Sequence, residues 1–251
     1  MMTLNVAHGS RNPIPSALLR RRTLARNLDA IAALVRRAEA DVVALQEIDR
    51  ASALSKNVDH FTWIAEAAAM PFRVHAPHGE RARLGMRHGH ALLSRHELYG
   101  AEDLRFDRRF CHDKGFVLAT LEVPELGGRA IDAVSVHLEP FAPNVRRSQI
   151  LELGAALRAR RERTKGRPLV VMGDMNTGYG DDRRGVGLLA KEAGLGAWRP
   201  SERMPTYAMS FPLVRFDWIL TSPELRIVDQ RTLPDRVSDH AAVVADIALS
   251  A

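Results

Sequence analysis

The stretch LVVMGDMN at residues 169–176 joins four apolar residues to a glycine and to two polar residues, Asp174 and Asn176. An apolar run of this length that ends at a turn-forming residue is typical of a short strand buried on both faces. The two polar residues would then lie where that strand ends. Runs of similar length recur along the chain, and we expect strands at Val42–Leu45, Ala91–Leu93, Val117–Val123, Ala130–Val136, Leu169–Met172, Phe216–Thr221 and Ala241–Ile247.

Helical periodicity occurs between these runs. Apolar residues at positions 24, 28, 31, 34 and 35 predict one helix, with basic residues on its other face. A second helix is expected across Val145–Arg161, and a weaker one across Asp59–Ala69. Many strands with a few interspersed helices indicate an α/β or α+β arrangement in which helices cover sheets. No linker or repeat divides the 251 residues, so we expect one domain over residues 1–251.

The composition, 46% apolar and 26% charged, is that of an ordinary globular chain rather than a disordered one. The single cysteine, Cys111, excludes an intramolecular disulfide and any site built from several cysteines. No apolar run is long enough to span a membrane, and the first residues lack the pattern of a signal peptide. We therefore expect a cytoplasmic monomer, although an upstream segment could precede Met1.

The chain is strongly basic, with a formal net charge of +6 and a pI of about 10.1. Arginine supplies 32 of the 36 basic residues. The guanidinium group matches the geometry of phosphate oxygens, but a biased codon composition would explain the excess equally well. The charge alone therefore indicates only that an anionic substrate would be tolerated.

Further polar residues stand at the ends of expected strands. Glu47 follows the run at 42–45, His137 follows the run at 133–136, and Asp239 precedes the last run. Each has an ordinary explanation: a solvated strand end for Glu47, a hydrogen-bonded core histidine for His137, and a turn cap for Asp239. An Asx turn would likewise explain Asp174 and Asn176. Their joint occurrence favours a site, because α/β sheets place their ligand crevice at strand ends.

The residue types in this set suit one kind of chemistry. Carboxylate and amide oxygens without thiols form a hard ligand set that favours Mg²⁺ or Mn²⁺ over zinc. Histidines could transfer protons or stabilise charge, and an aspartate could accept a proton from an attacking water. These groups fit metal-assisted phosphoester hydrolysis better than acyl transfer, for which the G-x-S-x-G motif is absent from the sequence.

Seven short motifs occur in order between residues 3 and 247: TLNV at 3–6, LQE at 45–47, GHALLSR at 89–95, VHL at 136–138, GDMN at 173–176, FDWI at 216–219 and SDH at 238–240. Together they resemble the endonuclease/exonuclease/phosphatase superfamily, the group related to pancreatic DNase. The resemblance implies a four-layer α/β sandwich, with two mixed sheets packed together between outer helices. It also implies divalent-metal-dependent cleavage of a phosphoester by direct attack of water.

Motif positions carry the family's roles over to individual residues. The resemblance implies that Asn5, Glu47 and Asp239 lie at the metal. Asp174 would orient or deprotonate the nucleophilic water, and Asn176 would hold that water and a phosphate oxygen. The expected cofactor is therefore Mg²⁺ or Mn²⁺, and the expected partner is a phosphoester substrate, with DNA and RNA among the candidates.

The remaining implied roles concern the phosphate. His240 would contact the scissile phosphate and be oriented by Asp217. His137 falls where DNase-like members carry a catalytic histidine and abasic-site nucleases tend to have tyrosine. Lys114 resembles a phosphate-contacting arginine of the relatives, which keeps the charge but loses the bidentate fork. A solvated lysine at a strand start is the alternative for Lys114.

Some residues depart from the family pattern, and these departures bear on which substrate is expected. Residues 48–49 are Ile-Asp, where abasic-site nucleases usually continue with lysine. His90 stands where relatives often have asparagine and could contact phosphate or metal, although an exposed polar loop explains residues 87–90 more simply. Residues 7–12 are expected at the rim of the site. Residues 205–214 are the candidate for touching a lipid surface, but a substrate-lining loop is the simpler interpretation.

Nucleic acids and smaller or lipid phosphodiesters therefore both stay open as substrates, as does peripheral contact with lipid. Aromatic residues make up only 6% of the chain and the arginines are dispersed, although folding could still cluster them into a groove. Two other functions compete with hydrolysis at a hard-metal site. One is a non-catalytic, basic nucleic-acid-binding relative of the same fold. The other is a zinc hydrolase built on the ten histidines, for which no H-E-x-x-H motif is present.

Overall fold

A computed structural model describes residues 1–12, 15–78, 87–107, 114–180, 183–197, 204–207 and 214–250, so Cys111 lies outside the described residues. Within them the strands form two six-stranded sheets. The first sheet has the order β11-β12-β1-β2-β4-β3, with bounds Leu225–Thr232, Val243–Leu249, Met2–Asn5, Val42–Asp49, His88–Ser94 and Phe72–Ala76. The second has the order β5-β6-β7-β8-β10-β9, with bounds Tyr99–Arg105, Gly115–Val123, Arg129–His137, Leu169–Asp174, Asp217–Thr221 and Gly196–Ala197.

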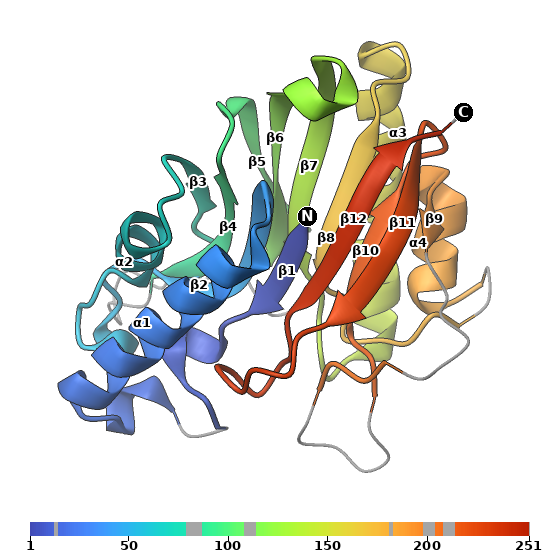
Figure 1. Cartoon of the computed structure of the whole chain (residues 1–251). Helices are drawn as coiled ribbons and strands as arrows, with labels where there is room; N and C mark the ends of the chain where they lie inside the picture. The colour runs from blue at the N-terminus through green and yellow to red at the C-terminus, as the bar shows by residue number, and fades with distance from the viewer. Residues whose placement is uncertain are drawn as a thin grey trace.

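Each sheet has one parallel pair among its described neighbours. Strands β1 and β2 are parallel and are joined by α1 (Arg21–Ala38), and strands β7 and β8 are parallel and are joined by α3 (Pro143–Arg163). A helical crossover is the usual way to join parallel strands. The other described pairs are antiparallel, so both sheets are mixed. The carboxyl ends of the parallel strands lie toward the lower edge in Figure 1.

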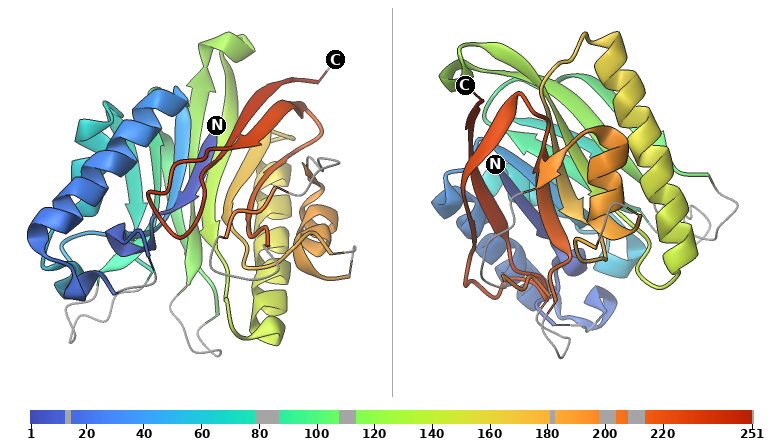
Figure 2. Two further views of the ribbon diagram at one scale, coloured as in Figure 1. Left: turned by 60° about the horizontal axis from the view of Figure 1, so that its bottom comes forward. Right: turned by 90° about the vertical axis from the view of Figure 1, so that its right-hand side faces the viewer.

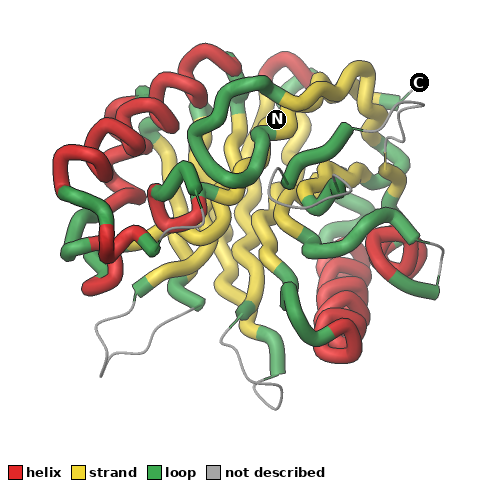
Figure 3. Tube along the Cα trace, turned by 90° about the horizontal axis from the view of Figure 1, so that it is seen from below, coloured by secondary structure: helices red, strands yellow, loops and turns green. Residues whose placement is uncertain are grey.

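Three apolar clusters hold four layers together. One packs α1 and α2 (His60–Ala67) on the first sheet, and another packs α3 and α4 (Gly185–Ala193) on the second. The third joins the sheets and contains small or branched residues such as Ala44, Ala119 and Val170. Figure 3 shows the strands between helices on both outer sides, and Figure 2 shows α3 and α4 over the second sheet. The structure thus confirms the four-layer sandwich of two mixed sheets.

The predicted helices form with longer or shorter bounds. The five apolar positions expected in the first helix are at most 1% exposed and face the first sheet. This helix ends at Ala38, where Glu39 adopts a left-handed φ of 51°. Helix α2 begins at His60 because the side chain of Asp59 accepts the backbone N–H of Thr62. None of the described helices is both long enough and apolar enough to cross a membrane.

The seven predicted strands are confirmed as β2, β4, β6, β7, β8, β10 and β12, with shifts at several ends. Helix α4 and strands β3, β5, β9 and β11 were not predicted. Strand β5 lies at a sheet edge and is largely exposed, so its sequence lacks a continuous apolar run. Helix α4 begins with GVG, which weakens its helical signal.

Helix α3 is anchored to the second sheet by an arginine. The Arg160 guanidinium donates to Asp132 (2.8 Å), to Glu102 (2.7 Å) and to the hydroxyl of Thr120 (2.9 Å). Asp132 is only 1% exposed, so its charge depends on this partner and on Arg167 at 3.2 Å. These contacts hold α3, the helical crossover between β7 and β8, against the second sheet.

Candidate active site

Asn5 and Glu47 come from the parallel pair of the first sheet. Glu47 adopts a left-handed φ of 52° where the register of β2 against β4 shifts between Leu45 and Ile48. This conformation is uncommon for a residue with a side chain, and such bulges re-aim side chains. The Asn5 side-chain nitrogen donates to Glu47 Oε1 (3.3 Å) and to Asp174 Oδ2 (3.0 Å). Asn5 therefore links carboxylates of the two sheets.

The second sheet brings three polar side chains to adjacent strands. His137 pairs with Asp174 in the register of β7 and β8, and Asp174 pairs with Asp217 in that of β8 and β10. Asn176 follows with φ of 49°; its backbone N–H donates to Asp174 Oδ1 (2.9 Å) and its side-chain amide donates to the carbonyl of Leu138 (2.9 Å). These bonds fix Asp174 and Asn176 relative to each other.

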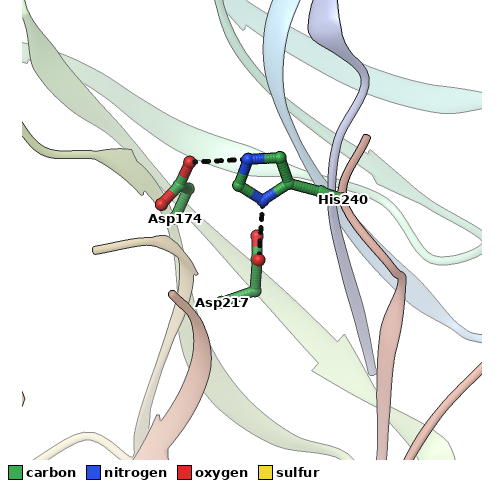
Figure 4. A group of neighbouring side chains, drawn as sticks. All are labelled: Asp174, Asp217 and His240. Carbon is green, nitrogen blue, oxygen red and sulfur yellow. Dashed lines mark hydrogen bonds and ion pairs between the residues drawn. The ribbon is translucent and has the colours of Figure 1, made fainter. Parts of the chain in front are cut away.

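His240 lies between two carboxylates (Figure 4). Its Nδ1 is 2.8 Å from Asp217 Oδ2, and its Nε2 is 3.6 Å from Asp174 Oδ2. The His240 backbone forms an isolated bridge with Tyr207, which follows Thr206 in the chain. The Thr206 hydroxyl accepts the backbone N–H of Asp217 (3.0 Å). The same short segment therefore positions both members of the His240–Asp217 pair.

One pocket of about 370 Å³ gathers most of the predicted site. Its lining includes the predicted residues Asn5, Glu47, His137, Asp174, Asn176, Asp239 and His240, together with Pro140, Phe141, Tyr207 and Phe216. Asp217 is fully buried and reaches the pocket through His240. Tyr207 comes from residues 205–214, the region predicted to line the substrate, of which residues 208–213 lie outside the described residues; Phe216 follows two residues after that region. We call this the catalytic pocket.

Burial and crowding raise the pKa values of two carboxyl groups in the catalytic pocket. Burial raises the pKa of Asp174 to about 6; His240 opposes the rise and Asp217 adds to it. Burial also raises the pKa of Asp239, and the nearby charge of Glu47 adds to this effect. Like charges held close together disfavour ionisation of one another. The pocket therefore carries a surplus of negative charge that a cation would relieve.

The two histidines of the catalytic pocket differ in charge. Burial opposes the charged form of His240, but Asp217 and Asp174 outweigh it and raise the pKa to about 10. Burial, reinforced by the charge of Lys114, lowers the pKa of His137 well below its usual value. At neutral pH His240 is thus cationic and His137 is neutral, so the two rings are suited to different roles.

The donor chemistry of the catalytic pocket fits a hard divalent cation. Glu47, Asp174 and Asp239 present carboxylate oxygens without a thiol, as Mg²⁺ prefers. The amide oxygen of Asn5 accepts the backbone N–H of Ala7 (2.9 Å), while its nitrogen faces the carboxylates. In this arrangement the Asn5 side-chain nitrogen contacts the carboxylates, and the role of Asn5 at a metal stays a prediction.

One group of three possible ligand atoms lies within 4.8 Å in the described part of the chain, on Asp174, Asp217 and His240. His240 Nδ1 is hydrogen-bonded to Asp217 and its Nε2 lies 3.6 Å from Asp174 Oδ2, and the raised pKa of His240 keeps the ring charged, so the three side chains form an ion triad. We therefore assign these three side chains to holding a cationic imidazole.

Lys114 and His90 lie in a second, smaller pocket of about 70 Å³ that shares Glu47 and His137 with the catalytic pocket. Lys114 is partly buried at the start of β6, and its ammonium group donates to the carbonyl of Leu138 (3.3 Å). Burial lowers its pKa, although Glu47 favours the charged form. The alternative of a freely solvated lysine does not describe this side chain.

The expectation of an exposed loop at residues 87–90 is wrong for its last three residues. His88, Gly89 and His90 belong to β4, and His90 is only 4% exposed. A Cβ on Gly89 would overlap the carbonyl oxygen of Ala76, so glycine permits the close pairing of β4 with β3. Because β4 pairs with β3 up to His90, the strand includes both histidines, and the His90 side chain is buried rather than exposed on a loop.

His8 and Asp49 form a pair beside Glu47 that the sequence analysis did not single out. His8 Nδ1 lies 2.9 Å from Asp49 Oδ1, and its Nε2 lies 3.4 Å from Glu47 Oε2. Burial opposes the charge on His8, but Asp49 and Glu47 raise its pKa to about 9. Residues 7–12 were expected near the site, and His8 lies there. The one indication of this pair in the sequence is Asp49, a charged residue two positions after Glu47.

Comparison with solved structures shows the same fold in proteins of low sequence identity. An endonuclease/exonuclease/phosphatase from Beutenbergia cavernae is 21% identical with a TM-score of 0.78, and the match covers 99% of this chain and 71% of the other. The human Nocturnin catalytic domain with bound sulfate is 20% identical, with a TM-score of 0.72 and coverage of 99% and 92%. A mannosyl-6-phosphatase from Bacteroides thetaiotaomicron is 12% identical, with a TM-score of 0.77 and coverage of 98% of each chain.

At these identities the likeness shows the fold alone. A search of curated protein sequences gives no match. The family comparison is more direct, because one family model aligns with residues 2–240, which include every motif and every polar side chain of the catalytic pocket. The chain therefore belongs to the Endonuclease/Exonuclease/phosphatase family.

Proposed function

We propose that the protein is a divalent-metal-dependent phosphoester hydrolase, most simply a phosphodiesterase, in which water attacks phosphorus directly. The observation that carries this proposal is the His240 ring held between Asp174 and Asp217, at 3.6 Å and 2.8 Å, in a pocket that Glu47 and Asp239 also line. A cationic imidazole beside crowded carboxylates suits a phosphate bound together with a cation.

Each side chain has a role in this proposal. Glu47 and Asp239 would hold a divalent ion such as Mg²⁺, which when bound supplies Lewis-acid polarisation of a phosphoryl oxygen. Asp174 would accept the proton of the attacking water, and Asn176, fixed to it, would orient that water. His240 would donate to a phosphate oxygen and stabilise the charge that develops there, with Asp217 holding the ring.

The substrate is proposed as a class rather than a compound. Nucleic acids and smaller or lipid phosphodiesters both fit a catalytic pocket with Phe141, Tyr207 and Phe216 in its wall. Among structurally similar proteins, one is named a mannosyl-6-phosphatase and another binds sulfate. One observation argues against a non-catalytic binding relative. The chain keeps three side chains that such a relative would not need, and they contact one another: Asp174, Asp217 and His240.

Hydrolysis of bis-p-nitrophenyl phosphate with Mg²⁺ or Mn²⁺ tests the proposal. We expect turnover that EDTA abolishes and that Asp174→Asn reduces at least about 100-fold, since general-base contributions are of that order. Asp246→Asn, which changes an exposed carboxylate paired with Arg231, is the matched control and should keep full activity. Full activity of Asp174→Asn, or salt-sensitive nucleic-acid binding with no turnover, would overturn the assignment.

Asp217→Asn tests the role of the buried pair. The variant keeps the shape of the side chain but removes the charge that stabilises cationic His240, so we expect kcat to fall about 10²–10⁴-fold with little change in KM. His96→Gln, outside both pockets, serves as the control. A normal kcat in Asp217→Asn would show that His240 needs no oriented positive charge.

A further inference from the structure

A third pocket, of about 460 Å³, adjoins the catalytic pocket. It is formed by the first turns of α3 and by the segment that leads into α4, and these two helices pack side by side (Figure 2). Thr177 lines it and directly follows Asn176 of the catalytic pocket, and Pro143 lines it three residues after Pro140 of that pocket. Consecutive Cα atoms are about 3.8 Å apart, and three residues span roughly 11 Å at most. A substrate whose phosphate occupies the catalytic pocket can therefore extend into the third pocket.

Arginine side chains give the third pocket its charge, and we call it the arginine pocket. Arg146 and Arg147 come from the first two turns of α3, and Arg184 directly precedes α4. The lining contains no carboxylate; residues 181–182, which are both aspartate, lie outside the described residues. A guanidinium group stays charged at physiological pH and only donates hydrogen bonds. The lining is therefore suited to an anion.

The two exposed arginines of the arginine pocket lack carboxylate partners within the described part of the chain. Neither Arg147 nor Arg184 forms an ion pair with a described residue, although both are exposed. By contrast, exposed Arg158 of the same helix α3 pairs with Glu192 of α4 at 2.8 Å. The helices therefore pair their charges along their length, but present unpaired guanidinium groups at the end that adjoins the catalytic pocket.

Arg146 connects the arginine pocket to the catalytic pocket. Its Nη1 donates to the carbonyl oxygens of Glu139 (2.6 Å) and Pro140 (3.0 Å), and its side chain also lines the arginine pocket. Pro140 and the next residue, Phe141, line the catalytic pocket. An anion in the arginine pocket would therefore lie against the side chain that holds part of the catalytic wall in place.

The backbone adds to the positive character of the arginine pocket. Helix α3 has 21 residues, and its first turn has no acidic residue and no side-chain cap from a described residue. Pro143 and Asn144 of this turn line the pocket. The first turn of a helix carries partial positive charge, which favours an anion. The first N–H groups of α4 are already paired with the carbonyl groups of residues 178–179, which fixes this side of the pocket.

We infer that the arginine pocket binds a second phosphate group of the substrate while the scissile phosphate occupies the catalytic pocket. This inference rests on the proposed function and narrows its substrate class to phosphoesters with another phosphate close to the one that is cleaved. A neighbouring phosphodiester of a nucleic-acid strand and a second phosphate of a small molecule share this chemistry. Guanidinium groups match the geometry of phosphate oxygens, and binding of a remote group helps to position the reacting one.

Two pairs of ligands, each matched except for one phosphate, test the inference by isothermal titration calorimetry. Thymidine 3′,5′-diphosphate is compared with thymidine 5′-monophosphate, and fructose 1,6-bisphosphate with fructose 6-phosphate. The full chain carries Asp174→Asn, which removes the proposed base and so prevents turnover, and Mg²⁺ is present throughout. In at least one pair we expect the ligand with two phosphates to bind at least about tenfold more tightly, the effect of one charge-assisted hydrogen bond.

Substitution of the two exposed arginines locates the second phosphate. The advantage of the second phosphate should be lost when Arg147→Gln and Arg184→Gln are combined. It should be kept in a control that combines Arg129→Gln and Arg226→Gln, which removes the same charge from two exposed arginines outside the pockets. Arg129 begins β7, whereas His137 of the catalytic pocket ends it. Thermal unfolding of each variant checks its folding.

The two ligand pairs also distinguish the sources of the second phosphate. An advantage in the thymidine pair alone would support a nucleic-acid strand, and an advantage that includes the fructose pair would support a small phosphoester. Equal affinities within both pairs would overturn the inference. So would an advantage that survives the loss of Arg147 and Arg184, or one that the control loses to the same extent. Hydrolysis of bis-p-nitrophenyl phosphate, which has a single phosphate, tests the proposed function separately, so the two failures are distinguishable.

Discussion

Replacement of His60 by leucine should make the fold less sensitive to acid. His60 is the first residue of α2, its side chain is fully buried, and neither ring nitrogen has a partner within the described residues. Burial lowers its pKa from 6.5 to about 4; Asp49 and Asp59 oppose this shift, and His8 reinforces it. The ring is therefore neutral in the folded chain at pH values where it is already charged in the unfolded chain.

The sign and size of the effect follow from these two pKa values. Between pH 4 and pH 6.5 the unfolded chain binds more protons at His60 than the folded chain does, so acid favours unfolding. Linkage with pKa values of 6.5 and about 4 gives a loss of about 1.4 kcal/mol at pH 5.5 and about 2.5 kcal/mol at pH 4.5, relative to pH 7.5. His60→Leu removes this contribution and fills the site with a side chain of similar size.

Urea unfolding at pH 7.5, 5.5 and 4.5, followed by circular dichroism, measures the effect. The free energy of unfolding of wild type should fall by about 2.5 kcal/mol more than that of His60→Leu between the first and last pH. His96→Leu, a partly exposed ring near Glu125, is the control and should behave as wild type. Parallel pH profiles for wild type and His60→Leu would refute the reasoning.

Three further outcomes follow from contacts described above. Gly89→Ala should lower the free energy of unfolding by about 2–4 kcal/mol in urea, because its Cβ overlaps a carbonyl oxygen of β3, whereas Gly178→Ala, with open space around it, should change little. Arg160→Leu should cost about 2–4 kcal/mol by leaving buried Asp132 underpaired, whereas Arg163→Leu, on an exposed pair, should cost under about 1 kcal/mol. EDTA should abolish phosphodiester hydrolysis, with recovery on adding Mg²⁺, while far-ultraviolet circular dichroism stays unchanged.

The central strands and the sheet edge that carries the candidate site can be predicted from the sequence, and the reason is physical. Continuous apolar runs mark strands buried on both faces, and a polar residue directly after such a run has nowhere to lie except the end of the sheet. Asp174 and His137 follow this logic and pair in the register of β7 and β8. Outer elements such as β5 and α4 carry weaker patterns, because exposure or glycine removes the periodicity.

What could not be predicted depends on backbone detail or on tertiary contact. The orientation of Glu47 rests on a left-handed bulge that no local motif marks. The burial of His90 depends on a glycine that lets two strands pair closely. The contact between His8 and Asp49 joins residues 41 positions apart. None of these features is visible in hydrophobic periodicity, which reports only which face of an element is covered.

The small side chains between the two sheets also set how precisely the site is aligned. Glu47 and His137 belong to opposite sheets, with 3.7 Å between Oε1 and Nδ1, and the layer beneath them contains Ala44 and Ala119. Adding methylene groups in that layer would force the sheets apart before it unfolded them. A displacement of about 1 Å between reacting groups can cost roughly 100-fold in rate. Folded but inactive variants should therefore arise in the middle of the sandwich, far from any residue that touches substrate.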